Sequence, residues 1–122
     1  MLSTGIDLIE VSRIQNVIER YGERFLSRVF TETELAYCRG RPPQLAARFA
    51  AKEAVSKMLG TGIQHPAGVG WCEIQIVSDE RGKPAVQLSG KAAQRAAEMK
   101  LKYMSLSLSH TNEHAIAIIV AE

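Results

Sequence analysis

A glutamate and a lysine one helical turn apart are the first residues of this chain whose types and spacing could do chemistry. The segment Arg48 to Gly62, RFAAKEAVSKMLGTG, is predicted to form one helix. At about 100° per residue, Glu53 and Lys57 project on the same side of it as two alanines. An amphipathic helix normally separates charged from small apolar residues, so this side favours a site that a ligand approaches closely. The alternative is an i,i+4 ion pair that only stabilises a solvated helix surface.

A second carboxylate lies in the first predicted strand. Asp7 stands between Ile6 and Leu8, where it is either on an exposed polar face or held at a site. With Glu53 it would form a two-carboxylate site for Mg²⁺, in which waters and substrate phosphate oxygens complete the coordination. Lys57 could then meet a phosphate, and the GTG after the helix could let backbone amides approach one. These residues favour a metal-assisted reaction on a phosphate-bearing substrate.

Two histidines and two cysteines are not expected to take part in chemistry on the basis of their spacing. His110 and His114 are four apart, which would bring them together only on a helix. Strand and turn are predicted there, so a zinc pair is not expected. Cys38 and Cys72 have neither CxxC spacing nor a nearby histidine, and both are expected to be reduced packing residues.

The elements that must position these residues follow from periodicity, turn residues and helix caps. Capping boxes at Ser12 and Thr31 begin two helices, and Gly22 ends the first. Trp71–Val77 alternates, and turn residues separate it from a second strand, which predicts a hairpin; two last strands joined by a short turn form another pair. In chain order we predict a strand in Met1–Glu10, helices Ser12–Gly22 and Thr31–Cys38, a breaker Arg39–Pro43, the central helix, a loop Thr61–Gly70, strands Trp71–Val77 and Pro84–Leu88, a helix Gly90–Lys100, and strands Met104–Ser109 and Ala115–Ala121.

This order predicts an α+β fold with a mainly antiparallel sheet packed on helices. With 122 residues, 46% of them hydrophobic and 23% charged, residues 1–122 fit one domain with a modest core. The longest apolar run, Ala115 to Ala121, is too short to span a membrane, and no signal segment precedes Asp7, so a cytoplasmic protein without membrane contact is expected. A net charge of +2 without basic runs argues against nucleic acid as a partner.

The first predicted helix and the residues just after it carry two stripes. The apolar stripe is expected to face the core and consists of Ile14, Ile18, Tyr21 and Phe25. The outward stripe is basic and consists of Arg13, Val17, Arg20 and Arg24. Exposed arginines add little stability but can meet an acidic partner. The alternative is that they are solvated charges paired with Glu19 and Glu23.

Four segments carry a resemblance to a known family: GID near the N-terminus, RFAAKEAVSKMLGTGI in the middle, DERGKP in the predicted hairpin, and SLSHT near the end. In this order and spacing they resemble the holo-[acyl-carrier-protein] synthases, the short group of 4′-phosphopantetheinyl transferases. The resemblance spans nearly the whole chain, and the central segment is its most specific part. One departure is the lead-in STGID, which replaces the commoner double glycine before the aspartate.

The resemblance implies a single 4′-phosphopantetheinyl transferase-like domain that transfers the phosphopantetheine arm of coenzyme A to a serine of an acyl carrier protein. Adenosine 3′,5′-bisphosphate is released, and the reaction supports fatty acid biosynthesis. By the same resemblance Asp7 and Glu53 bind Mg²⁺ or Mn²⁺, and Lys57 contacts a phosphate. Glu53, or a water that it holds, is the candidate base for the serine proton.

The resemblance also implies binding surfaces and an assembly. The residues implied to contact coenzyme A are Arg48, Lys57, Gly60, Thr61, Gly62, Ile63, Gly82, Lys83, Pro84, His110 and Thr111. An acidic carrier protein would dock on the stripe Arg13, Val17, Arg20 and Arg24. Related short enzymes are homotrimers with sites between subunits, so a homotrimer is expected here.

Two rival functions need consideration. One is a non-catalytic module that holds a nucleotide or an acidic protein. The other is a small metal-dependent phosphohydrolase, which would also use two carboxylates and a lysine. The arginine stripe discriminates between the enzymes, because a hydrolase of small molecules has no need of it.

Overall fold

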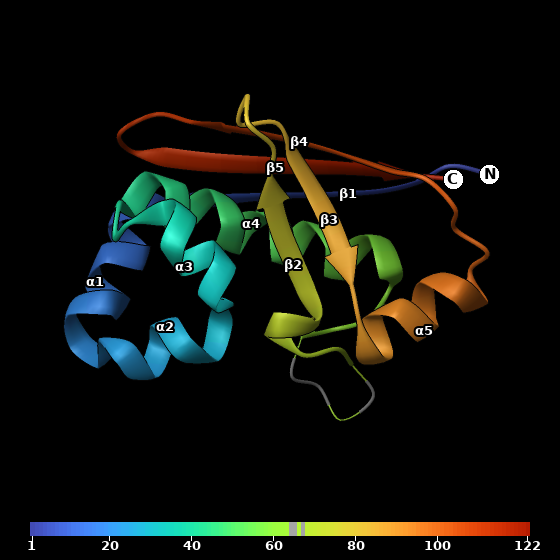
Figure 1. Ribbon diagram of the computed structural model, residues 1–122, viewed down its shortest axis with the longest axis horizontal. Helices are drawn as coiled ribbons and strands as arrows, with labels where there is room; N and C mark the ends of the chain where they lie inside the picture. Colours follow the sequence, from blue (N-terminus) through green and yellow to red (C-terminus); the bar gives the residue numbers. More distant parts are fainter. Residues whose placement is uncertain (64–65, 67) are drawn as a thin grey trace.

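The layers of this fold are built around one long helix, α4 (Pro42–Leu59). The computed structural model describes residues 1–63, 66 and 68–122. In it, α4 packs against one face of a three-stranded antiparallel sheet in the order β1-β5-β4, which lies across the top of Figure 1. These strands are β1 (Ser3–Glu10), β4 (Met104–His110) and β5 (His114–Ala121). The predicted α+β fold with antiparallel pairing is therefore confirmed.

The first strand runs so close to α4 that only glycine fits at one position. A Cβ atom on Gly5 would collide with the carbonyl oxygen of Ala54 and would lie 3.1 Å from Ile119 Cγ2. The sheet-facing side of α4 is lined with buried alanines, which permits this approach. The glycine of the GID segment thus brings β1, and Asp7 two residues later, against the helix.

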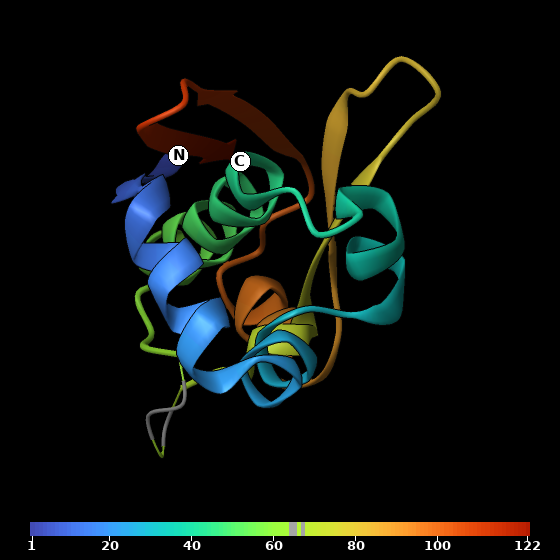
Figure 2. The ribbon, with the colours of Figure 1, turned by 90° about the vertical axis from the view of Figure 1, so that its left-hand side faces the viewer.

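The remaining elements surround α4 on its other sides. The helices are α1 (Val11–Tyr21), α2 (Glu23–Val29), α3 (Glu32–Cys38) and α5 (Gly90–Glu98). A two-stranded hairpin is formed by β2 (Ile74–Ser78) and β3 (Pro84–Leu88), preceded by a 3-10 turn, η1 (Trp71–Glu73). In Figure 2, α1 lies in front of α4, and α2 lies lower in the view, with η1 beside it. The hairpin is a second sheet, which the sequence did not separate from the first.

A buried ion pair holds α4 to α3 and to the hairpin. The ammonium of Lys52 lies 2.8 Å from Glu34 Oε1, and both side chains are fully buried. Lys52 also donates to the carbonyls of Trp71 and Ile74, at 3.0 and 2.7 Å. Glu34 accepts from the Ile76 amide at 2.7 Å, in addition to completing the predicted capping box at the start of α3. Burial lowers the pKa of Lys52, and the carboxylate of Glu34 opposes this shift. The two opposite charges therefore compensate one another inside the protein.

Two predicted helix starts are wrong. The helix α1 begins at Val11 rather than after a cap at Ser12, because the Val11 amide donates to the Glu113 carbonyl in the β4–β5 turn. The predicted breaker before the central helix also fails, since Pro42 is its first residue. Proline is favoured there because its missing amide hydrogen needs no partner. Gly60, at φ 71°, ends α4 as predicted.

Three further expectations need correction. Helix α2 was not predicted; Gly22, at φ 53°, turns the chain directly from α1 into it, so Arg24 belongs to a separate helix. Tyr21, expected in the core, is 48% exposed because α1 ends there. Cys72 is exposed, whereas burial raises the pKa of Cys38 to about 11 and keeps that thiol protonated.

The predicted strand Trp71–Val77 begins three residues too early. Glu73 is drawn out of the sheet because its carboxylate accepts the amides of Gly70 and Lys91, at 2.7 and 3.1 Å. Residues 64–65 and 67 of the predicted loop 61–70 lie outside the described residues. Within the described part of the chain, no helix is both long and apolar enough to cross a membrane.

Candidate active site

The carboxylate of Asp7 and the ammonium of Lys57 meet between β1 and α4. The Lys57 Nζ atom lies 2.9 Å from Asp7 Oδ1 and 3.0 Å from the carbonyl oxygen of Ile6. Their side chains remain 18% and 54% exposed, so a ligand can reach both. Lys57 therefore bonds to β1 rather than forming the i,i+4 pair with Glu53 that the sequence left as the alternative.

Glu53 completes this group of charges. Burial raises the pKa of its carboxyl group, and the negative charge of Asp7 raises it further, while Lys57 and Arg13 oppose the shift. Two carboxylates that repel one another are a good place for a divalent cation, which relieves the repulsion. The described residues offer no cluster of three or more His, Cys, Asp or Glu ligands. An ion held by Asp7 and Glu53 would thus keep positions for water and for phosphate oxygens, which suits Mg²⁺.

Arg48 lies on the opposite side of α4 from Lys57. The two are nine residues apart, which is about 180° around the helix axis. Arg48 is buried; it donates to Ser78 Oγ at 3.0 Å and to the Gln44 carbonyl at 3.3 Å. Its guanidinium carbon lies 4.4 Å from the ring centroid of Tyr37. This arginine is thereby tied to α3 and to the end of β2.

The turn of the β2–β3 hairpin reaches the same cluster. At Gly82, φ is 81°, and a Cβ atom there would lie 3.6 Å from the Tyr37 hydroxyl. The turn is closed by Asp79, whose carboxylate accepts the amides of Arg81 and Lys83. The predicted coenzyme A residues Gly82, Lys83 and Pro84 therefore gather near Arg48, while Asp7, Glu53 and Lys57 form a separate cluster across the helix.

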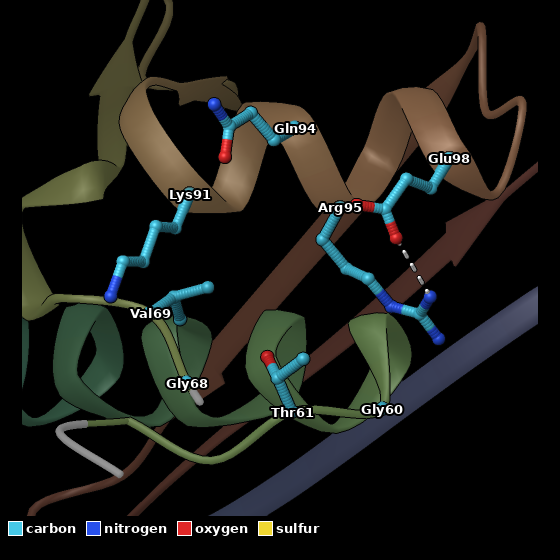
Figure 3. A pocket seen from close by; sticks show the side chains of 8 residues that line it. All are labelled: Gly60, Thr61, Gly68, Val69, Lys91, Gln94, Arg95 and Glu98. Atoms are coloured by element: carbon cyan, nitrogen blue, oxygen red, sulfur yellow. Dashed lines mark hydrogen bonds and ion pairs between the residues drawn. The ribbon is translucent and has the colours of Figure 1, made fainter. Parts of the chain in front are cut away.

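The glycine-rich segment after α4 opens onto a third region. Gly60 and Thr61 line a cavity of about 410 Å³ together with four residues of α5, drawn in Figure 3. These residues are Lys91, Gln94, Arg95 and Glu98. Arg95 donates to the carbonyl of Leu59 at 2.9 Å and so covers the end of α4. Gly62 is exposed, and Ile63 forms an isolated parallel bridge to Val69. The end of α4 thus offers a largely polar cavity one turn beyond Lys57.

The two predicted contacts near the C-terminus occupy the β4–β5 connection. His110 is the last residue of β4 and is exposed. The hydroxyl oxygen of Thr111 accepts the amides of Glu113 and His114, at 3.2 and 3.1 Å, and so shapes the turn. The predicted turn 110–114 is shorter than expected, because both histidines belong to strands.

The comparison with protein families decides the identity. Residues 3–119 match the model of the 4′-phosphopantetheinyl transferase superfamily. The chain belongs to this superfamily. Among curated relatives it is 49% identical to the holo-[acyl-carrier-protein] synthase of Herpetosiphon aurantiacus, over 98% of both chains. It is 47% identical to that of Dehalococcoides mccartyi, over 100% of this chain and 99% of the relative. Within the superfamily it is therefore an enzyme of the holo-[acyl-carrier-protein] synthase family.

Solved structures agree with this placement. The Helicobacter pylori synthase in complex with coenzyme A superposes with a TM-score of 0.87 at 29% identity, covering 98% of this chain and 99% of that chain. The Neisseria meningitidis synthase has a TM-score of 0.85 at 35% identity, covering 98% and 97%. The fold of this chain is the fold of the synthase family, as the four sequence segments predicted.

The basic stripe of the synthase lies on two helices. Arg13 and Arg20 are exposed on α1, and Arg24 is exposed on α2, so the predicted outward orientation is confirmed. In the described part of the chain no salt bridge joins these arginines to Glu19 or Glu23. The guanidinium carbon of Arg20 instead lies 5.4 Å from the ring centroid of Tyr21.

Sequence reasoning missed residues that shape the site without carrying its chemistry. Lys52 and Glu34 fix how α4 is turned about its axis, and Tyr37 supports Arg48. The sequence indicated that Lys52 could be buried, because it falls among apolar residues of the predicted helix. Its partner could not be found, because Glu34 lies in a different helix and is distant in the sequence.

Proposed function

We propose that this chain transfers the 4′-phosphopantetheine arm of coenzyme A to a serine of an apo-acyl carrier protein, with Mg²⁺, in support of fatty acid biosynthesis. The observation that carries the proposal is the meeting of Asp7, Glu53 and Lys57 on one side of α4, in a chain of the synthase family. Transfer to a phosphorus centre needs mainly positioning and neutralised oxygen charge. Adenosine 3′,5′-bisphosphate is the other product.

On this side of α4, Asp7, Glu53 and Lys57 have two proposed roles, which are to bind charged groups and to accept a proton. Asp7 and Glu53 would hold the divalent ion, which supplies neutralisation of charge on the pyrophosphate. Lys57, which is half exposed beside Asp7, would contact a phosphate oxygen of coenzyme A. Glu53, whose pKa is raised by burial and by Asp7, is better suited than an ordinary glutamate to accept the serine hydroxyl proton, directly or through a water.

The separation of the binding residues supports a site shared between copies of the chain. Arg48 and the hairpin turn face away from Lys57, so one chain does not bring them to the same phosphate chain. We infer that a neighbouring copy supplies them, as expected for a homotrimer. The outer face of the three-stranded sheet supports contact between copies, because it exposes large apolar side chains that include Ile6, Leu8 and Ile118, at 54, 62 and 42%.

The carrier protein is proposed to dock on the exposed basic stripe. Arg13, Arg20 and Arg24 surround Val17, so an acidic partner with an apolar centre would fit there. Arg13 also opposes the rise in the pKa of Glu53, which supports a docking surface near the carboxylates. A carrier docked on α1 therefore brings its serine toward the proposed metal site.

One incubation tests the proposed function. The full chain is mixed with an apo-acyl carrier protein, coenzyme A and Mg²⁺, and the carrier is weighed by mass spectrometry. The expected result is a single added phosphopantetheine and an equal amount of adenosine 3′,5′-bisphosphate, abolished by a chelator of divalent ions. Hydrolysis of coenzyme A without modification of the carrier would support the phosphohydrolase instead. No reaction with any divalent ion, but retention of nucleotide, would support the binding module.

A further inference from the structure

The loop 60–70, which connects α4 to η1, is attached to α5 at both of its ends. At the start of the loop, Arg95 Nε donates to the carbonyl oxygen of Leu59 at 2.9 Å. At the far end, the carboxylate of Glu73 accepts the amide of Gly70 at 2.7 Å and the amide of Lys91 at 3.1 Å. Lys91 and Arg95 both belong to α5, which lies alongside the two ends of the loop in Figure 3. One helix therefore fixes both where the loop leaves α4 and where it enters η1.

The far end of the loop supports the segment that follows α4. The amide of Val69 donates to the carbonyl of Gly62 at 3.0 Å, and Ile63 forms its parallel bridge with Val69. Gly70 follows Val69 directly, so the hydrogen bond between Gly70 and Glu73 also restricts Val69. Residues 60–63, which the family resemblance assigns to coenzyme A, are thus supported from Glu73 through the main chain of the loop.

The start of α5 is shaped to accept the carboxylate of Glu73. Gly90 has φ 53°, and a Cβ atom on it would collide with Glu73 Oε2. The amide of Ser89 donates to the main-chain carbonyl of Glu73 at 3.0 Å. Hydrogen bonds to a charged carboxylate are stronger than those to a neutral acceptor. Glu73 is therefore attached to α5 through both its side chain and its main chain.

We propose that Glu73 is a positioning residue, which keeps the loop 60–70 in the conformation that binds substrate. The inference rests on the proposed function, because coenzyme A is the substrate assigned to residues 60–63. Glu73 acts through the loop, since its carboxylate and carbonyl accept amides of Gly70, Ser89 and Lys91, none of which is assigned to coenzyme A. A loop that is already ordered loses less conformational entropy when a ligand binds, so releasing it lowers the affinity.

Two variants remove the contact in different ways. Glu73→Gln replaces one of the two accepting oxygens by an NH₂ group, which cannot accept a hydrogen bond from an amide. Gly90→Ala keeps the carboxylate but places a methyl group where it lies. We expect each variant to raise the Kd for coenzyme A, measured by calorimetry with Mg²⁺, about tenfold. The KM for the carrier should be unchanged, because the arginine stripe takes no part in these hydrogen bonds.

Each variant has a matched control. Gly22 has the same φ of 53°, but among the described residues a Cβ atom there would meet only the Ile18 carbonyl oxygen, at 4.0 Å. Gly22→Ala therefore introduces similar backbone strain without displacing a carboxylate. Glu98→Gln removes a carboxylate of α5 that pairs with Arg95, at 3.4 Å, and does not bond to Gly70. Both controls should bind coenzyme A as the parent does.

Hydrogen exchange measures the state of the loop without any substrate. In the parent, the amides of Val69 and Gly70 are hydrogen-bonded. We expect both amides to exchange at least about tenfold faster in Glu73→Gln and Gly90→Ala, as followed by NMR, while amides of β5 keep their rates. A purely structural Glu73 would instead lower the Tm and leave the Kd for coenzyme A unchanged.

Three results would overturn the inference while leaving the proposed function in place. The first is an unchanged Kd for coenzyme A in both variants although the Gly70 amide exchanges faster. The second is full protection of the Val69 and Gly70 amides in both variants. The third is an equal loss of affinity in Gly22→Ala. A parent that binds coenzyme A about ten times more tightly than Glu73→Gln, but never modifies the carrier, would contradict the proposed reaction and retain the positioning role.

Discussion

The charged residues on the two sides of α4 differ in how deeply they are buried and in how fully they are paired. On the side of α3 and the hairpin, Lys52 is fully buried and has Glu34 and two carbonyls as partners. On the side of β1, Glu53 has a raised pKa because it is partly buried near Asp7, and Lys57 is half exposed. The first group is balanced within the chain. In the second group, burial and the charge of Asp7 disfavour the ionised form of Glu53.

This contrast indicates which charges serve the fold and which await a ligand. A buried pair with all its hydrogen bonds made restricts α4 to one rotation about its axis. Carboxylates held close together at an accessible place destabilise the protein unless a cation joins them. The same helix therefore carries its structural and its functional charges on different sides, and the following variants test that division.

The largest expected effect comes from the carboxylates at β1. Asp7→Ala and Glu53→Ala should each lower the rate of carrier modification about a thousandfold, because each removes a ligand of the proposed ion. Since both would serve one ion, the double variant should be hardly slower than either single one. Initial rates at saturating Mg²⁺ measure this. A double variant whose loss is the product of the single losses would contradict a shared site.

The buried pair should affect stability rather than chemistry. Lys52→Met leaves Glu34 charged without its partner and should lower the free energy of unfolding by about 3–5 kcal/mol. Adding Glu34→Gln, which keeps an acceptor for the Ile76 amide, should restore a large part of that loss. Urea denaturation of the single and double variants measures both. Unchanged stability in Lys52→Met would show that the pair does not fix α4.

Charge reversal on the basic stripe should change recognition of the carrier. Arg20→Glu should raise the KM for the carrier about tenfold at low salt, since exposed charges act through association. Its KM for coenzyme A and its Tm should stay close to those of the parent. Arg13 is a less specific choice, because it also acts on Glu53. The matched control Lys102→Glu reverses an exposed charge outside the stripe; an equal effect there would point to net charge alone.

The smallest effect concerns the pH dependence of stability. A raised pKa means that Glu53 favours the folded state when protonated, and that this contribution is lost as pH rises through its folded pKa. Glu53→Gln should therefore have a slightly higher Tm than the parent at neutral pH. The difference should shrink as pH falls toward the ordinary glutamate pKa of about 4.3.

With Mg²⁺ present, the parent should become more stable than Glu53→Gln. Mg²⁺ binds the folded parent and should raise its Tm, but should do little for Glu53→Gln. Thermal scans across pH, with and without the ion, measure both trends. A parent that is more stable than Glu53→Gln at neutral pH without metal would contradict the view that the two carboxylates oppose folding.

Much of the fold followed from local signals in the sequence. The capping box at Thr31 and the glycine that ends α4 each act within a few residues, and both were predicted, as were the strands β3, β4 and β5. Predictions from local sequence failed where a hydrogen bond to a residue in another element determined the structure. The start of α1 depends on the Glu113 carbonyl, and η1 replaces a strand because Glu73 bonds to Gly70 and to Lys91.

The sequence by itself determined the family and the types of residue that would do the chemistry, because a glutamate and a lysine one turn apart share a helix side in any fold. Only the tertiary structure decided their partners. Gly5 lets β1 lie against α4, so Lys57 bonds to Asp7 rather than to Glu53. The same packing turns Arg48 toward Tyr37, on the far side of the helix. Distances between residues far apart in the chain depend on how elements pack, and no local pattern records that.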